Sequence, residues 1–255
     1  MMIAVPLYDD APARRTPVVT YAIIGLCLLV FLWQQGLPTD QEHAIEYGLG
    51  MLPAVLFGHA ALPPWLAFVP PWATILTSMF LHGGWMHVLG NMLYLWIFGK
   101  GVENALGPWR FSALYLLSGV AAALTQGLID TSSEVPMIGA SGAIAGVLGA
   151  YLLLYPRGNV VVFFWLFIII RLLQVPAPIL LGLWFLLQLW SAAIASGEPG
   201  VAVWAHVGGF LAGMALVVLL RPKQVPLFLP ARSQAFTRSR ALPPVGRPRG
   251  PWGPF

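Results

Sequence analysis

Long segments without a charged side chain are the feature that most constrains this chain. Residues 17–35 and 201–220 contain no Asp, Glu, Lys or Arg, and each is close to the roughly 20 residues that a helix needs to cross the hydrocarbon core of a bilayer. Only 9% of the chain is charged and its mean hydropathy is +0.79, whereas about 25% of residues are charged in soluble domains. The sequence therefore predicts an integral, multi-pass membrane protein.

Six apolar segments fit transmembrane helices, so the predicted fold class is an all-α membrane protein with a six-helix bundle. The first connection, at 36–73, is too apolar for a disordered loop and contains Trp, so we expect it to fold at the membrane interface. Residues 1–16 form a short N-terminal segment, and residues 221–255 are rich in Pro, Arg and Gly, which predicts a disordered tail. The predicted spans are 17–35, 80–101, 109–129, 141–155, 178–195 and 201–220.

The positions of the basic residues decide between six spans and seven. Residues 160–173 are apolar except for Arg171, and a span there would bury that charge in the bilayer. With six spans, all 13 Lys and Arg side chains fall on one side of the membrane, as the positive-inside rule requires of the cytoplasmic side. We therefore expect both termini in the cytoplasm, an interfacial or re-entrant segment at 160–173, and contact between the basic tail and anionic lipid.

Four polar side chains lie at a similar depth in the predicted spans, in the outer half of the membrane. Ser141 begins the fourth span, and His206 lies about six residues into the last one, roughly 9 Å at 1.5 Å per residue. His87 and Asn91 lie in the outer half of the second span and share one helix face, because they are four residues apart. Ionisable groups are expensive inside a bilayer, so these residues mark a candidate functional site.

Small residues surround both Ser141 and His206. Gly139 and Gly142 flank the serine, and Gly209 follows the histidine on the last span. Small residues spaced four apart allow membrane helices to approach closely, so on its own the serine is explained as a small polar filler at a helix contact. The same contact would bring its hydroxyl within hydrogen-bond reach of the imidazole of His206, which is what activation of a nucleophile requires.

His87 and Asn91 can both donate hydrogen bonds, and such donors suit the negative oxygen of a tetrahedral intermediate. The backbone N–H of Ser141, at the start of a helix, is a further donor. Neither Asp nor Glu lies in a predicted span near this depth. The residues therefore favour a Ser–His dyad over a triad.

These motifs resemble the rhomboid family of intramembrane serine proteases. The resemblance extends from the first span to about residue 220 and rests on His87-x-x-x-Asn91, Gly139-Ala140-Ser141-Gly142 and Ala205-His206-Val207-Gly208-Gly209, in that order. It implies that Ser141 is the nucleophile and that His206 is the general base and then the acid. It also implies oxyanion stabilisation by His87, Asn91 and the Ser141 N–H. Gly139, Gly142 and Gly209 support the motifs.

The resemblance further implies cleavage of single-pass transmembrane proteins near the outer face, with substrates that pass the fifth span, 178–195. Such substrates and membrane lipid are the expected partners; nucleic acid is not, and neither cofactor nor metal is expected. The expected location is a bacterial plasma membrane.

The chain departs from the family pattern at one position. Some family members carry an aromatic residue four positions after the serine, stacked on the histidine, where this chain has Ala145. The residue that supports the ring of His206 is therefore unidentified.

Two alternatives from other classes stay open. A polytopic transporter could use His87, Asn91 and His206 as a proton relay, but it would call for charged residues at mid-membrane or broken-helix repeats. A non-catalytic, rhomboid-like protein could bind membrane helices, but it would be expected to lack the serine or the histidine. For His82, a structural role at the start of the second span is favoured over chemistry.

Overall fold

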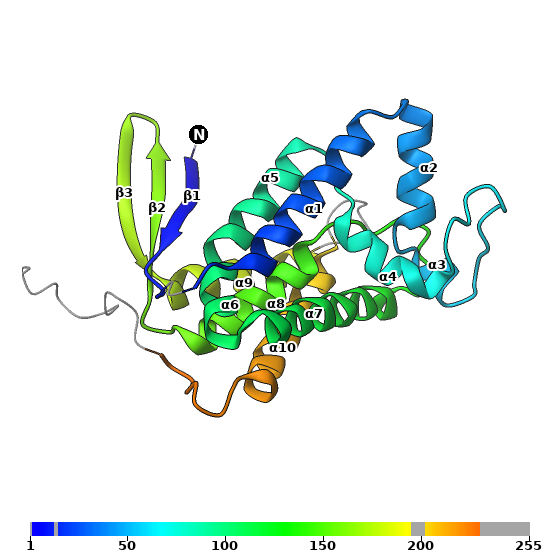
Figure 1. The fold of residues 1–255 in the computed structure, drawn as a ribbon. Helices are drawn as coiled ribbons and strands as arrows, with labels where there is room; N and C mark the ends of the chain where they lie inside the picture. The colour runs from blue at the N-terminus through cyan, green and yellow to red at the C-terminus, as the bar shows by residue number, and fades with distance from the viewer. Residues whose placement is uncertain (1, 13–14, 195–201, 230–255) are drawn as a thin grey trace, which may run out of the picture.

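The computed structural model describes residues 2–12, 15–194 and 202–229, and most of these residues form helices (Figure 1). A π-helical stretch, η3 (Leu95–Gly99), joins helix α5 (Trp85–Tyr94) to helix α6 (Lys100–Leu106) in one continuous helical segment. Two short 3-10 turns, η1 (Pro71–Ala73) and η2 (Ser78–Phe80), flank α4. The helices are α1 (Val18–Gln35), α2 (Thr39–Leu49), α3 (Pro53–Leu56), α4 (Thr74–Thr77), α5 (Trp85–Tyr94), α6 (Lys100–Leu106), α7 (Pro108–Ile129), α8 (Ser141–Leu154), α9 (Ala177–Ile194) and α10 (Val203–Leu220).

Every segment predicted to span the membrane contains a helix. Three of the described helices, α1, α7 and α10, are long and apolar enough to cross a bilayer. α8 is a shorter apolar helix of 14 residues, and the apolar helix α9 runs over 18 residues, Ala177–Ile194. The number of membrane crossings, six, stays a prediction.

The connection after α1 contains α2, α3 and η1. Met51 pairs with Met137 through two backbone hydrogen bonds of 3.0 and 2.9 Å, and the backbone N–H of Ala54 donates to the carbonyl oxygen of Ser133. These bonds fix the connection to the segment that leads into α8. The position of this connection relative to a membrane stays a prediction.

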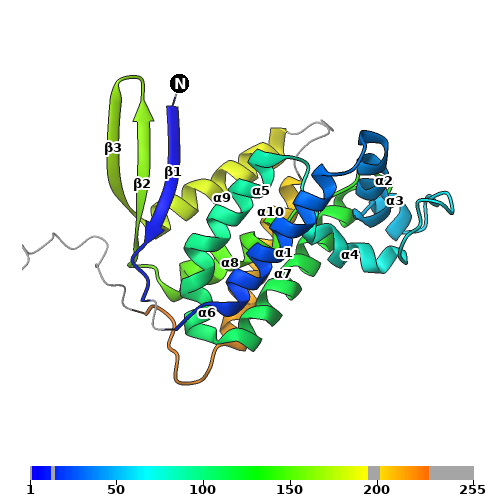
Figure 2. The ribbon, with the colours of Figure 1, turned by 45° about the horizontal axis from the view of Figure 1, so that its top comes forward.

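The prediction of an all-helical fold is wrong in one region, because the described residues include an antiparallel sheet. β1 (Met2–Asp9), β2 (Asn159–Leu166) and β3 (Ile169–Pro176) pair in the order β1-β2-β3 and lie to one side of the helices (Figures 1 and 2). Residues 159–176 are rich in Val, Ile and Phe, which favour strands, and a hairpin satisfies its own backbone groups. The segment is therefore not a seventh helix, and the N-terminal segment is part of a sheet.

The prediction of disorder from residue 221 onward is wrong for residues 225–229, which pack against the helices. The N–H groups of Phe228 and Leu229 donate to the carbonyl oxygens of Leu153 and Leu154, at 3.0 and 2.6 Å, which satisfies carbonyls at the end of α8. Leu227 and Leu229 also pack against the buried core. Residues 225–229 are Val-Pro-Leu-Phe-Leu, an apolar run that suits such packing. Residues 230–255 lie outside the described part of the chain.

α8 lies inside the bundle and contacts α5, α7, α9 and α10 (Figures 1 and 2). The glycines of α10 lie against the backbone of α8: a Cβ atom added at Gly209 would collide with the carbonyl oxygen of Gly142, and one added at Gly213 with that of Gly146. The close packing that the small-residue spacing predicts is therefore confirmed. It places Ser141 and His206 on helices whose backbones touch.

Glu103 links α6 to the start of α1. The residue is 4% exposed, and its carboxylate accepts hydrogen bonds from the N–H groups of Val19 and Thr20 and from the Thr20 hydroxyl, at 2.9, 2.7 and 2.7 Å. The residue before α1 is Pro17, which makes no side-chain cap. Because the first N–H groups of a helix lack intrahelical acceptors and carry partial positive charge, Glu103 caps α1 from a distant point in the chain.

Replacing Glu103 with Ala removes this cap, and we expect the detergent-solubilised protein to lose about 1.5–3 kcal/mol of stability, the typical value of a hydrogen bond to a charged group. The measurement is the thermal unfolding midpoint. Glu134→Ala, at an exposed carboxylate, is the matched control. Equal midpoints for the two variants would show that the cap contributes nothing.

Replacing Gly213 with Ala forces a methyl group against the Gly146 carbonyl oxygen, and overpacking of this kind typically costs about 1–3 kcal/mol. Gly182→Ala on α9 is the control, because an added Cβ there meets nothing within 4 Å. We expect a lower unfolding midpoint for the first variant only. A wild-type midpoint for Gly213→Ala would contradict tight packing of α8 on α10.

Candidate active site

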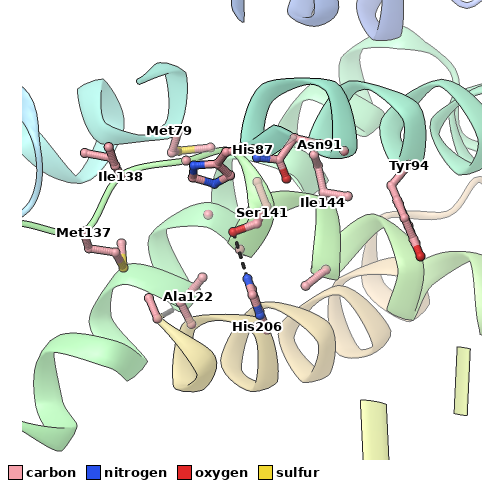
Figure 3. A pocket seen from close by; sticks show the side chains of 18 of the residues that line it. Met79, His87, Asn91, Tyr94, Ala122, Met137, Ile138, Ser141, Ile144 and His206 are labelled. Carbon is pink, nitrogen blue, oxygen red and sulfur yellow. Dashed lines mark hydrogen bonds between the residues drawn. The ribbon is translucent and has the colours of Figure 1, made fainter. Parts of the chain in front are cut away.

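A cavity of about 410 Å³ lies among α5, α7, α8, α9 and α10. Figure 3 shows its polar side chains, with His87 and Asn91 on one helix, and Ser141 and His206 joined by a hydrogen bond. Most of the remaining wall is apolar or backbone, including Met79, Met137, Ile138 and Ile144. The four polar residues that the sequence singles out therefore share one cavity.

Ser141 and His206 are brought together by the contact of α8 with α10. The serine is the first residue of α8, and the histidine lies in the first turns of α10. The distance between Ser141 Oγ and His206 Nε2 is 2.8 Å, across 65 residues of sequence. A serine hydroxyl that donates to an imidazole nitrogen can be deprotonated by it as the oxygen attacks a carbonyl.

Gly139 has a geometric role two residues before the serine. Its φ angle is +119°, a conformation that residues with a side chain rarely adopt, and its N–H donates to the Ser78 carbonyl oxygen at 2.8 Å. A Cβ atom at this position would lie 2.7 Å from Nε2 of His87. Glycine is therefore required both by the backbone turn and by the ring that lies against it.

His87 and Asn91 present hydrogen-bond donors from α5. The N–H of Gly83 donates to Nδ1 of His87 at 3.3 Å, so Nε2 is the ring nitrogen that carries the hydrogen. Asn91 is 8% exposed, and its side-chain NH₂ finds no acceptor among the described residues. A buried donor without a partner costs free energy. Such a group at a cavity wall is ready to bind an acceptor.

His82 lies behind the cavity wall, where its ring packs edge-on against the ring of His87 with 5.2 Å between centroids. Its ring nitrogen Nδ1 lies 3.2 Å from the Phe80 carbonyl oxygen, and its backbone N–H donates to Oε1 of Gln34 at 3.1 Å. The side chain is fully buried and does not line the cavity. These contacts agree with the structural role favoured for this histidine.

Two side chains of α9 contact His206 and were missed by sequence reasoning. Oε1 of Gln188 lies 2.8 Å from Nδ1 of the ring, and the Trp184 ring lies 5.9 Å away between centroids. They take the place of the aromatic residue that is absent at Ala145, which is buried in α8. The sequence does contain a clue to this role, because Gln188 is a polar residue in a largely apolar span and lies four residues after a Trp.

Comparison with known proteins agrees with the motifs. The sequence pattern of the Rhomboid domain matches residues 70–223. RHOMBOID-like protein 5 of Arabidopsis thaliana is 36% identical over 151 residues, which is 58% of this chain and 45% of that protein. Rhomboid-type serine protease 2 of Emericella nidulans is 31% identical over 150 residues, 57% of this chain and 26% of that protein.

A relative with a longer matched region is the mitochondrial Rhomboid protein 1 of Saccharomyces cerevisiae, 27% identical over 238 residues, 81% of this chain and 65% of that protein. The chain thus spans between 26% and 65% of the length of these three relatives. The matched domain includes the cavity, its four polar residues and the apolar helices α7 and α10. This chain therefore belongs to the rhomboid family and is an integral membrane protein.

Proposed function

We propose that this protein is an intramembrane serine endopeptidase that uses Ser141 and His206 as a catalytic dyad. The observation that carries the proposal is the 2.8 Å hydrogen bond between their side chains at the wall of a cavity. A family relative is itself described as a serine protease. Since both the nucleophile and the base are present, the non-catalytic alternative is disfavoured.

In the proposed reaction, Ser141 Oγ attacks the carbonyl carbon of the scissile peptide bond while Nε2 of His206 accepts the hydroxyl proton. The tetrahedral intermediate collapses as the imidazolium returns this proton to the leaving amine nitrogen. A water molecule, deprotonated by the same nitrogen, then attacks the acyl-enzyme ester. Collapse of this second intermediate breaks the ester bond, and the imidazolium returns the proton to Ser141 Oγ. The products are the amine fragment, the carboxyl fragment and the free serine.

The oxyanion of this intermediate would be stabilised by three donors. Asn91 supplies its unpartnered NH₂ group, His87 supplies Nε2–H, and Ser141 supplies the N–H of the first turn of α8. Held at fixed positions in a mostly apolar cavity, such donors act on charge that develops only in the transition state. Gly139 makes room for the His87 ring, Gly142 for the side chain of Ala122, and Gly209 for the carbonyl oxygen of Gly142.

We also propose single-pass transmembrane proteins as substrates, cleaved near the outer face, with six membrane spans and both termini in the cytoplasm. The distribution of the basic residues supports this topology. A bacterial plasma membrane is the proposed location; the relatives compared above come from a plant and from fungi, one of them mitochondrial. Neither a metal nor a cofactor has a step in this mechanism.

Ser141→Ala and His206→Ala should each abolish cleavage of a single-span test substrate in liposomes, because nucleophile and base act as a unit. The same variants should lose labelling by a fluorophosphonate, and their unfolding midpoints should stay near that of the wild type. Ser132→Ala, at an exposed loop serine, is the control for labelling. Undiminished cleavage by purified Ser141→Ala protein would contradict the proposal. A transporter would show no fluorophosphonate labelling that depends on Ser141.

Asn91→Ala should lower kcat by about 10²–10³, the typical cost of losing one oxyanion donor, with little change in KM. Asn104→Ala, at an amide that accepts a hydrogen bond from the Arg15 N–H outside the cavity, is the control. The measurement is steady-state cleavage in detergent. An unchanged kcat would assign Asn91 to packing rather than to chemistry.

A further inference from the structure

α9 provides the two side chains that hold the ring of His206. Oε1 of Gln188 lies 2.8 Å from Nδ1, and the Trp184 ring lies at 43° to the imidazole plane with 5.9 Å between centroids. Gln188 and Trp184 are four residues apart, so they project from one helix face. A polar amide inside an apolar helix costs free energy unless it is hydrogen-bonded. The imidazole nitrogen supplies that bond.

The amide oxygen selects the protonation pattern that a general base needs. A neutral imidazole carries one hydrogen, on either Nδ1 or Nε2. Because Oε1 of Gln188 can only accept, it favours the form with hydrogen on Nδ1, which leaves the lone pair of Nε2 directed at Ser141 Oγ. With the hydrogen on Nε2, the ring would face the serine hydroxyl with a donor and could not take its proton.

On this basis we propose that Gln188 is a positioning residue for His206, and that the placement of α9 therefore governs whether the dyad is aligned. The proposal rests on the proposed function of the dyad. It completes a chain of contacts, Ser141–His206–Gln188, whose third member is a neutral amide. A neutral group performs the orienting task without placing a carboxylate inside the bilayer, where a charge is expensive.

The attachment of α9 to the bundle makes such control physically reasonable. Aromatic rings form part of the contact between α9 and α10: the Phe185 and Phe210 rings stack at 4.5 Å between centroids, and Trp184 lies 6.1 Å from Phe210. The opposite side of α9 is exposed at large apolar residues such as Leu187 and Trp190. Displacement of α9 from α10 would carry Gln188 away from His206. Alignment of the base thus depends on a helix at the edge of the bundle.

The first test compares two substitutions at one position. Gln188→Met keeps the length of the side chain but lacks the acceptor oxygen, whereas Gln188→Glu retains an acceptor in either protonation state. We expect Gln188→Met to lower kcat and the rate of fluorophosphonate labelling by about tenfold to a hundredfold, with KM within about twofold of the wild type. Gln188→Glu should recover most of both rates. Leu187→Ala, at the neighbouring exposed residue, should behave as the wild type.

The outcomes separate positioning from packing. Wild-type rates in Gln188→Met would overturn the proposal, and so would equal losses in the Met and Glu variants, because both would then reflect packing alone. Should Gln188→Met fail to fold, a wild-type rate in Gln188→Glu supports the acceptor role and a loss in that folded variant opposes it. Absence of labelling in the wild-type protein would instead reject the proposed function.

The second test asks whether α9 acts through Gln188. Phe185→Ala removes the stack on Phe210 and should slow labelling of Ser141 by loosening α9. In the Gln188→Met background the same substitution should have little further effect, because the contact through which it acts is already lost. Additive losses in the double variant would show that α9 affects the dyad by another route and would overturn the coupling.

Discussion

The contact of two helix backbones underlies the rest of this structure. α8 and α10 approach so closely that Gly209 and Gly213 have no room for a Cβ atom against the carbonyl oxygens of Gly142 and Gly146. Within a bilayer, apolar side chains gain little by leaving lipid for one another, so close van der Waals packing of small residues is what holds such helices together. The same approach brings a hydroxyl to within 2.8 Å of an imidazole nitrogen. Packing and candidate chemistry therefore depend on one set of glycines.

Several polar groups in the bundle obtain a hydrogen-bond partner from another part of the chain. Glu103 caps α1, Gln34 accepts from the backbone of His82, and Gln188 accepts from His206. Each bond offsets the cost of placing a polar group in an apolar setting, and each ties together elements far apart in the sequence. Among the described residues of the cavity, Asn91 keeps a side-chain donor without an acceptor. This donor, at the wall of the cavity that holds Ser141 and His206, is the one assigned to the oxyanion in the proposed mechanism.

The sheet and the tail illustrate what hydropathy cannot resolve. Residues 160–173 are apolar in a way that suits a short span, an interfacial helix or a strand, and periodicity alone does not separate short apolar runs. The structure pairs them with β1, which starts 157 positions before β2 by residue number (Met2 against Asn159). Leu227 and Leu229 likewise find a place against α8 only after the bundle has formed. Both corrections concern long-range partners, which local composition does not reveal.

The sequence by itself determined the membrane character, the helical segments and the identities of the polar residues at issue. Charge-free segments of about 20 residues are typical of transmembrane helices. Ser141 and His206 each lie in a glycine-rich motif. Only the tertiary structure decided what holds the histidine. Gln188 lies 18 residues before His206 on a separate helix, and the direction of an amide toward a ring nitrogen depends on how two helices rotate against each other. That rotation is set by packing over the whole interface, so no local pattern encodes it.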